Sequence, residues 1–114
     1  MDFTVRENSG VLIISLTGDM IGGPDATKLS EALHEQVNAG RRNIVVDLRN
    51  VQWMNSSGLG ILIGGVSAVR NHGGDLRLLN LNEKPRKVLE VTQLDRIFKI
   101  YSSEAEAVES FQGK

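Results

Sequence analysis

The alternation of hydrophobic and polar positions changes its period along the chain, and each change indicates a new element. Alternating apolar and polar residues over 3–7 predict a half-buried strand, and a β-branched run over 11–17 predicts a second one. The turn signal Asn8-Ser9-Gly10 between them predicts an antiparallel hairpin. Apolar residues that recur every four positions over 25–39 then predict a helix with one buried stripe.

The remaining pattern alternates strands and helices. The nearly continuous apolar run over 43–48 predicts a central parallel strand, because such a strand is buried on both faces. The elements expected after it are a helix over 56–71, a strand over 75–80, a short helix over 83–92, a strand over 97–101 and a helix over 103–111.

This order predicts an α/β fold in a single domain that spans residues 1–114. We expect one mixed five-stranded sheet, parallel except at the N-terminal hairpin, with about four helices. Functional loops in such sheets usually lie beyond the carboxyl ends of the strands, which here are 19–24, 49–55, 80–82 and 101–102.

Composition excludes several classes of function. The net charge of −1 argues against direct DNA binding, which requires a basic excess. The chain has no cysteine, and its two histidines, His34 and His72, have no second ligand at metal-like spacing, so we expect no metal site and no cofactor. Neither a signal peptide nor a membrane span is evident, so a cytoplasmic location is expected.

One loop carries most of the functional information, the segment Trp53-Met54-Asn55-Ser56-Ser57-Gly58-Leu59-Gly60. Asn55 or Ser56 is suited to cap the following helix, and a helix N-terminus also favours an anion such as a phosphate on Ser56. Gly58 and Gly60 each lower helix propensity, by roughly 1 kcal/mol relative to alanine. Their presence predicts a close approach to the backbone, either by a neighbouring element or by a partner.

Apolar residues near this loop suggest an interface. Ile61 falls outside the apolar stripe of its helix, close to the N-terminal end. Together with Met20, Ile21 and Met54 on adjacent loops, it is expected to form an apolar patch ringed by polar groups, which is typical of a protein–protein contact.

These segments resemble the STAS domain, and specifically the bacterial anti-sigma factor antagonists. The resemblance covers essentially the whole chain and rests on the segments 16–20, 43–48, 51–60 and 94–98. The segment Asn55-Ser56-Ser57-Gly58-Leu59-Gly60 corresponds to the family signature of aspartate, two serines, glycine, leucine and glycine.

The resemblance implies a non-enzymatic protein that binds an anti-sigma factor, which is itself a serine kinase of the histidine-kinase-like ATPase type. The kinase would phosphorylate Ser56 and so end the binding, and a serine phosphatase would restore it. A monomer or weak dimer is expected. The partner-binding residues implied by position are Met20, Ile21, Asn55, Ser56, Ser57, Gly58 and Ile61.

The chain departs from the family pattern in two places. Asn55 replaces the signature aspartate, and the loop over 19–24 is about one residue longer, with Ile21 or Gly22 where an acidic residue is often found. The asparagine leaves open a second interpretation, a scaffold STAS domain of a sensory or lipid-transport assembly that is never phosphorylated. Nucleotide binding at the Ser56 helix N-terminus is a third. No nucleophile–base pair and no GxxxxGK loop support an enzyme.

Overall fold

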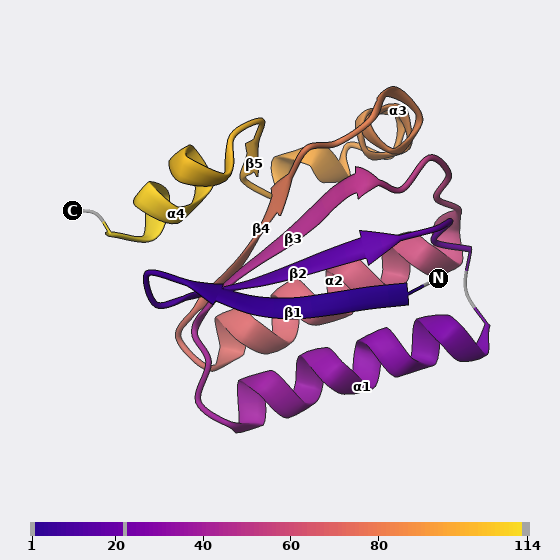
Figure 1. Ribbon diagram of the computed structural model, residues 1–114. Helices are drawn as coiled ribbons and strands as arrows, with labels where there is room; N and C mark the ends of the chain where they lie inside the picture. Colours follow the sequence, from indigo (N-terminus) through magenta and orange to yellow (C-terminus); the bar gives the residue numbers. More distant parts are fainter. Residues whose placement is uncertain (1, 22, 113–114) are drawn as a thin grey trace.

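Five strands form one mixed sheet in the computed structural model of the chain, which describes residues 2–21 and 23–112 (Figure 1). The strands lie in the order β1-β2-β3-β4-β5; β1 and β2 are antiparallel and the other neighbours are parallel, as predicted. The strands are β1 (Asp2–Asn8), β2 (Val11–Thr17), β3 (Asn43–Asn50), β4 (Asp75–Leu79) and β5 (Ile100–Tyr101). The helices are α1 (Pro24–Asn38), α2 (Ser56–Asn71), α3 (Glu83–Val91) and α4 (Glu104–Gln112), with a 3-10 turn at Leu94–Arg96.

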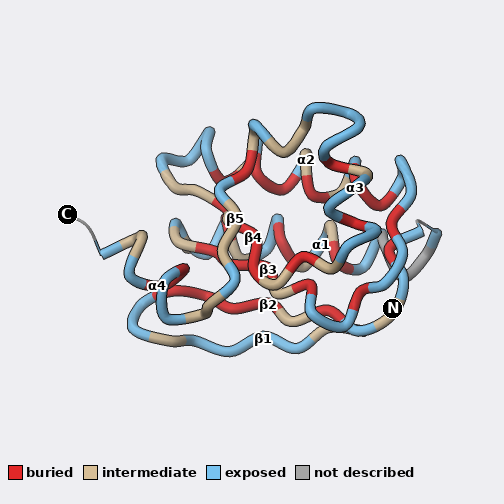
Figure 2. Tube along the Cα trace, turned by 90° about the horizontal axis from the view of Figure 1, so that it is seen from above, coloured by how far each residue is buried: buried red, intermediate tan, exposed pale blue. Residues whose placement is uncertain are grey.

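The N-terminal hairpin is closed by a tight turn. Asn8 pairs with Val11, and the two residues between them, Ser9 and Gly10, have φ angles of 53° and 83°. Positive φ at both central positions matches the right-handed twist of the strands, and glycine adopts it without strain. β1 forms the exposed edge of the sheet, whereas β2 and β3 are buried along most of their length (Figure 2).

Helices cover the two faces of the sheet and produce two cores. In β2, Leu12 and Ile14 belong to the main core, which α1, α2 and α3 cover. Val11 and Ile13, on the opposite face, pack with α4 in a smaller core. Burial on both faces explains the continuous apolar runs of these strands and confirms the central position expected for β3.

The last strand is shorter than predicted. A strand was expected over 97–101, but only Ile100–Tyr101 pairs with β4. Gln93 has a left-handed conformation (φ 62°) and begins the 3-10 turn, which uses the next residues. Phe98 is buried in the main core. The turn and the buried Phe98 thus occupy the segment in which local periodicity had predicted the start of the strand.

Asp75 links the start of β4 to α2 through charged hydrogen bonds. Its carboxylate accepts one from Arg70 Nε at 2.8 Å and one from Arg77 Nε at 3.0 Å. Arg70 also donates to the Ile97 carbonyl oxygen at 2.6 Å. Burial by itself would raise the pKa of Asp75, but the hydrogen bonds from Arg77 and Arg70 outweigh it and lower the pKa.

Candidate functional site

The loops that follow β2 and β3 are joined backbone to backbone. The Gly18 amide donates to the Asn50 carbonyl oxygen at 3.1 Å, and the Met20 amide donates to that of Trp53 at 2.9 Å. The Asn55 amide in turn donates to the Met20 carbonyl oxygen at 3.2 Å. The parallel pairing of the two strands thus continues as far as Asn55, the residue before α2. It fixes the segment 51–60, called the signature loop, relative to the loop after β2.

A side chain from the loop after β4 holds the signature loop on its other side. Asn82 Nδ2 donates to the carbonyl oxygens of Arg49 at 2.7 Å and Val51 at 2.8 Å. Arg49 lies at the end of β3 and Val51 directly follows the strand, both beyond the last residue pair between β3 and β4, Asp47 with Leu79. The sequence gives no sign of this contact, because the partners lie more than 30 positions apart.

Asn55 is the N-cap of α2, which settles the choice that the sequence left between Asn55 and Ser56. Its Oδ1 accepts a hydrogen bond from the Gly58 amide at 3.0 Å, and its Nδ2 donates to the Ile21 carbonyl oxygen at 3.0 Å. One neutral side chain therefore both caps the helix and fixes the neighbouring loop. An aspartate would have no proton for the second bond at neutral pH.

Ser56 and Ser57 are exposed in the first turn of α2. Within the described residues, the hydrogen bonds at this end satisfy the amides of Asn55 and Gly58, and they do not involve those of Ser56 and Ser57. The first turn contains no acidic side chain. A helix N-terminus with free amides and no nearby carboxylate in its first turn favours an added negative charge.

The two glycines of the signature have different roles. A Cβ on Gly58 would collide with the Met20 backbone, lying only 2.7 Å from its carbonyl carbon. Gly58 is buried against the neighbouring loop, the first of the two explanations that the sequence left open, and its contact with a partner stays a prediction. Gly60 is exposed, and a Cβ there would meet nothing within 4 Å.

The predicted apolar patch does not form as expected. Met20 is completely buried and Met54 is 6% exposed, because the joined loops turn both side chains into the main core. Met20 is therefore wrong as a surface contact. Ile61 is only partly exposed and packs against the same core. Ile21 does project, with 59% of its surface exposed, whereas Gly22 lies outside the described residues.

Trp53 is an exposed residue that the sequence analysis left without a role in binding. It is 53% exposed, although it lies between the buried residues Val51 and Met54. A tryptophan in a short polar loop is itself a signal of a binding surface, because large exposed aromatic side chains are enriched at such surfaces. The exposed surface around Ser56 is thus provided by Ile21, Trp53 and the first turn of α2.

Residues 2–21 and 23–112 contain no group of three or more histidine, aspartate or glutamate side chains able to hold a metal. His34 and His72 each place Nδ1 beside the carbonyl oxygen of the residue four positions earlier, at 2.8 and 2.9 Å. No helix in the described part of the chain has both the length and the apolar character needed to cross a membrane.

Comparison with known proteins gives consistent matches. Residues 2–107 match the family model described as the STAS domain. A candidate anti-sigma factor antagonist of Thermotoga neapolitana is 38% identical over 80 residues, 70% of this chain and 71% of the relative. The anti-sigma F factor antagonist of Paenibacillus polymyxa is 27% identical over 111 residues, 95% of this chain and 92% of the relative. The crystal structure of a candidate anti-sigma factor antagonist from Thermotoga maritima has a TM-score of 0.90 at 28% identity, covering 97% of this chain and 95% of that one.

Proposed function

Because the chain belongs to the STAS domain family, we propose that it is an anti-sigma factor antagonist whose binding is ended by phosphorylation of Ser56. Its partner is an anti-sigma factor and serine kinase of the histidine-kinase-like ATPase type, and a serine phosphatase reverses the modification. The role is non-catalytic and cytoplasmic. The observation that carries this proposal is the exposed Ser56 at a capped helix N-terminus, within a loop fixed on both sides.

The geometry supports a modification that leaves the fold intact. A phosphoserine adds a charge of about −1.5 to −2 at neutral pH. At an exposed helix N-terminus this charge is stabilised by about 0.3–1 kcal/mol. The cap is provided by Asn55 rather than by the serine, so modification of Ser56 removes no hydrogen bond that holds α2.

The same charge is unfavourable once a partner covers it. The exposed residues around Ser56 that the partner can reach are Ile21, Trp53, Ser57 and Gly60, and none of their own side chains carries a positive charge. A phosphate buried against a surface that had fitted a neutral hydroxyl loses water without gaining a counter-charge. Poor pairing of a buried charge costs several kcal/mol, and each 1.4 kcal/mol is about tenfold in affinity.

The test compares Ser56→Ala and Ser56→Asp with the unmodified protein. Histidine-kinase-like serine kinases of the source cell are titrated by calorimetry, and the thermal midpoint of each variant is measured. We expect similar midpoints, near-normal binding by the alanine variant, and at least about tenfold weaker binding by the aspartate variant. Ser67→Asp places the same charge on the exposed surface of α2, away from its N-terminus, and should leave binding unchanged.

Asn55 favours a second candidate, the scaffold STAS domain that is never phosphorylated. Its side-chain amide bonds to both the Gly58 amide and the Ile21 carbonyl oxygen, so its presence has a structural reason independent of any kinase. Equal binding by the Ser56 variants, together with an intact mass from native cells that never includes a phosphate group, would favour the scaffold and contradict the switch.

A further inference from the structure

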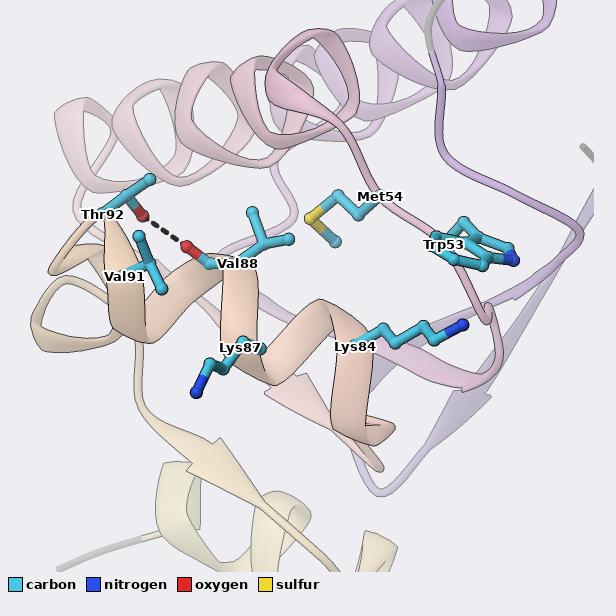
Figure 3. A pocket seen from close by; sticks show the side chains of 7 residues that line it. All are labelled: Trp53, Met54, Lys84, Lys87, Val88, Val91 and Thr92. Atoms are coloured by element: carbon cyan, nitrogen blue, oxygen red, sulfur yellow. Dashed lines mark hydrogen bonds between the residues drawn. The ribbon is translucent and has the colours of Figure 1, made fainter.

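A groove of about 440 Å³ lies between the signature loop and α3, next to the exposed surface around Ser56, with which it shares Trp53 (Figure 3). Its volume is within the range of small-molecule sites, which are concave and mostly apolar. Seven residues of the two elements line it: Trp53, Met54, Lys84, Lys87, Val88, Val91 and Thr92. Val91 is 70% exposed and Trp53 is 53% exposed, so the two walls present large apolar surfaces to solvent.

The polar groups of the groove are nearly all of one kind. The Thr92 hydroxyl donates to the Val88 carbonyl oxygen at 2.8 Å, so it is already paired. The indole nitrogen of Trp53 points away from the groove (Figure 3). The polar groups still available to a ligand are the ammonium groups of Lys84 and Lys87, on α3. No carboxylate lines the groove, and among the described residues neither lysine is in an ion pair.

Lys84 is held at the mouth of the groove by the aromatic side chain opposite. Its ammonium group lies 3.5 Å from the centroid of the Trp53 ring, a cation–π contact that joins α3 to the signature loop. This contact fixes the position of the charge without neutralising it. An anionic group that enters here meets a positive charge beside an apolar wall.

We propose that this groove binds a long-chain carboxylate of the fatty-acid type. The alkyl chain lies between Trp53 and Val91 over Val88, and the carboxylate pairs with Lys84 at the Trp53 end of the groove. The charge complementarity supports this ligand: the available polar groups are cations, of which Lys84 lies at the Trp53 end and Lys87 points the other way, beside an otherwise apolar surface (Figure 3). The proposal does not rest on the partner-switching function. The groove shares Trp53 with the exposed surface around Ser56, but Ser56 and the first turn of α2 do not line it.

The probe is dodecanoate below its micellar concentration, followed through the fluorescence of Trp53, the only tryptophan in the chain. We expect a saturable change. Dodecanol, which lacks the charge, and acetate, which lacks the chain, should each bind at least about tenfold more weakly. Equal binding of dodecanol or of acetate would contradict a site that needs both parts.

Two variants locate the ligand. Val91→Asp places a carboxylate on the exposed apolar wall, and the double variant Lys84→Gln, Lys87→Gln removes both cations; each should weaken binding at least about tenfold. Val5→Asp, on exposed β1, and Lys28→Gln, on α1, are matched controls that should bind normally. Thermal midpoints confirm folding.

Unchanged binding in the groove variants overturns the proposal. Absence of dodecanoate binding, with Val91→Asp weakening the kinase complex instead, would also overturn it and assign the groove to a protein partner.

Discussion

The Met20 carbonyl group lies directly against the α-carbon of Gly58. The same carbonyl oxygen accepts the hydrogen bond from the Asn55 amide, so the loop after β2 crosses the first turn of α2 at the point where a side chain would obstruct it. This contact explains why Gly58 is required by the fold, whatever binds to the surface above it.

Gly58→Ala should therefore destabilise the protein. The added methyl group would meet rigid backbone rather than a flexible side chain, and overpacking of this kind costs about 1–3 kcal/mol. Denaturant unfolding measures the change. Gly64→Ala, where a Cβ has open space, is the control and should not destabilise. A Gly58→Ala variant as stable as the unmodified protein would contradict the close approach.

Gly60→Ala should separate stability from binding. Gly60 is exposed with open space around it, so alanine should stabilise α2 by about 0.5–1 kcal/mol through its higher helix propensity. If the partner approaches this part of the helix, the methyl group should weaken the kinase complex severalfold. Thermal unfolding and calorimetric titration measure the two effects. The control Gly64→Ala should give the same stabilisation with normal binding. If Gly60→Ala and Gly64→Ala lost affinity equally, a contact centred on the first turn of α2 would be contradicted.

Asn82→Ala should loosen the signature loop from the side of β4. Its amide satisfies the carbonyl groups of Arg49 and Val51, and removing such a partner costs about 1–3 kcal/mol. We expect lower stability and a changed Trp53 emission, because the tryptophan lies next to the freed segment. Asn71→Ala, at the exposed end of α2, should alter neither. Unchanged emission and unfolding in Asn82→Ala would show that the loop is held without this side chain.

Asn55→Asp should keep the helix cap but lose the bond to the loop after β2. A carboxylate oxygen can still accept from the Gly58 amide, and its charge favours the helix N-terminus by about 0.3–1 kcal/mol. It cannot donate to the Ile21 carbonyl oxygen. Hydrogen exchange of the backbone amides at positions 20 and 55 should therefore become faster, while the thermal midpoint changes little.

Asn55→Ala loses both bonds and should lower the free energy of unfolding by about 0.5–2 kcal/mol. Equal exchange in the aspartate variant and the unmodified protein would show that the Ile21 bond does not hold the loop.

Stability should fall in acid. Hydrogen bonds from Arg6 and Asn8 lower the pKa of Glu104, and hydrogen bonds from Arg77 and Arg70, which outweigh burial, lower that of Asp75. The folded protein thus binds fewer protons than the unfolded chain, whose carboxyl groups titrate near pH 4, at about 3.9 and 4.3. This stabilisation is present at neutral pH and is lost as the pH falls through about 4 toward the lower folded values.

Denaturant midpoints between neutral pH and about pH 3 measure this loss. Asp75→Asn should lower stability at neutral pH and reduce the acid dependence, since it removes one of the titrating groups. Asp95→Asn changes a carboxyl group outside the described ion pairs and is the matched control. A steep acid dependence that persists unchanged in Asp75→Asn would place the responsible carboxyl group elsewhere.

The sequence by itself determined the order of the elements, the α/β class and the position of the signature loop. Local periodicity and turn chemistry suffice for this, because each strand and helix presents its own apolar face and each turn its own residues. The same reasoning predicted α2 as 56–71, which is confirmed. It failed at β5, where Phe98 is taken into the main core and the strand begins only at Ile100.

Only the tertiary structure decided which side chains of the site are exposed. Met20 and Ile21 are neighbours in one loop, yet one is fully buried and the other is 59% exposed. The difference arises because the loop pairs with a segment more than 30 positions away, and this pairing directs alternate side chains to opposite sides. The groove between Trp53 and α3 has the same origin. Its walls come from separate parts of the chain, which meet only when the sheet is complete.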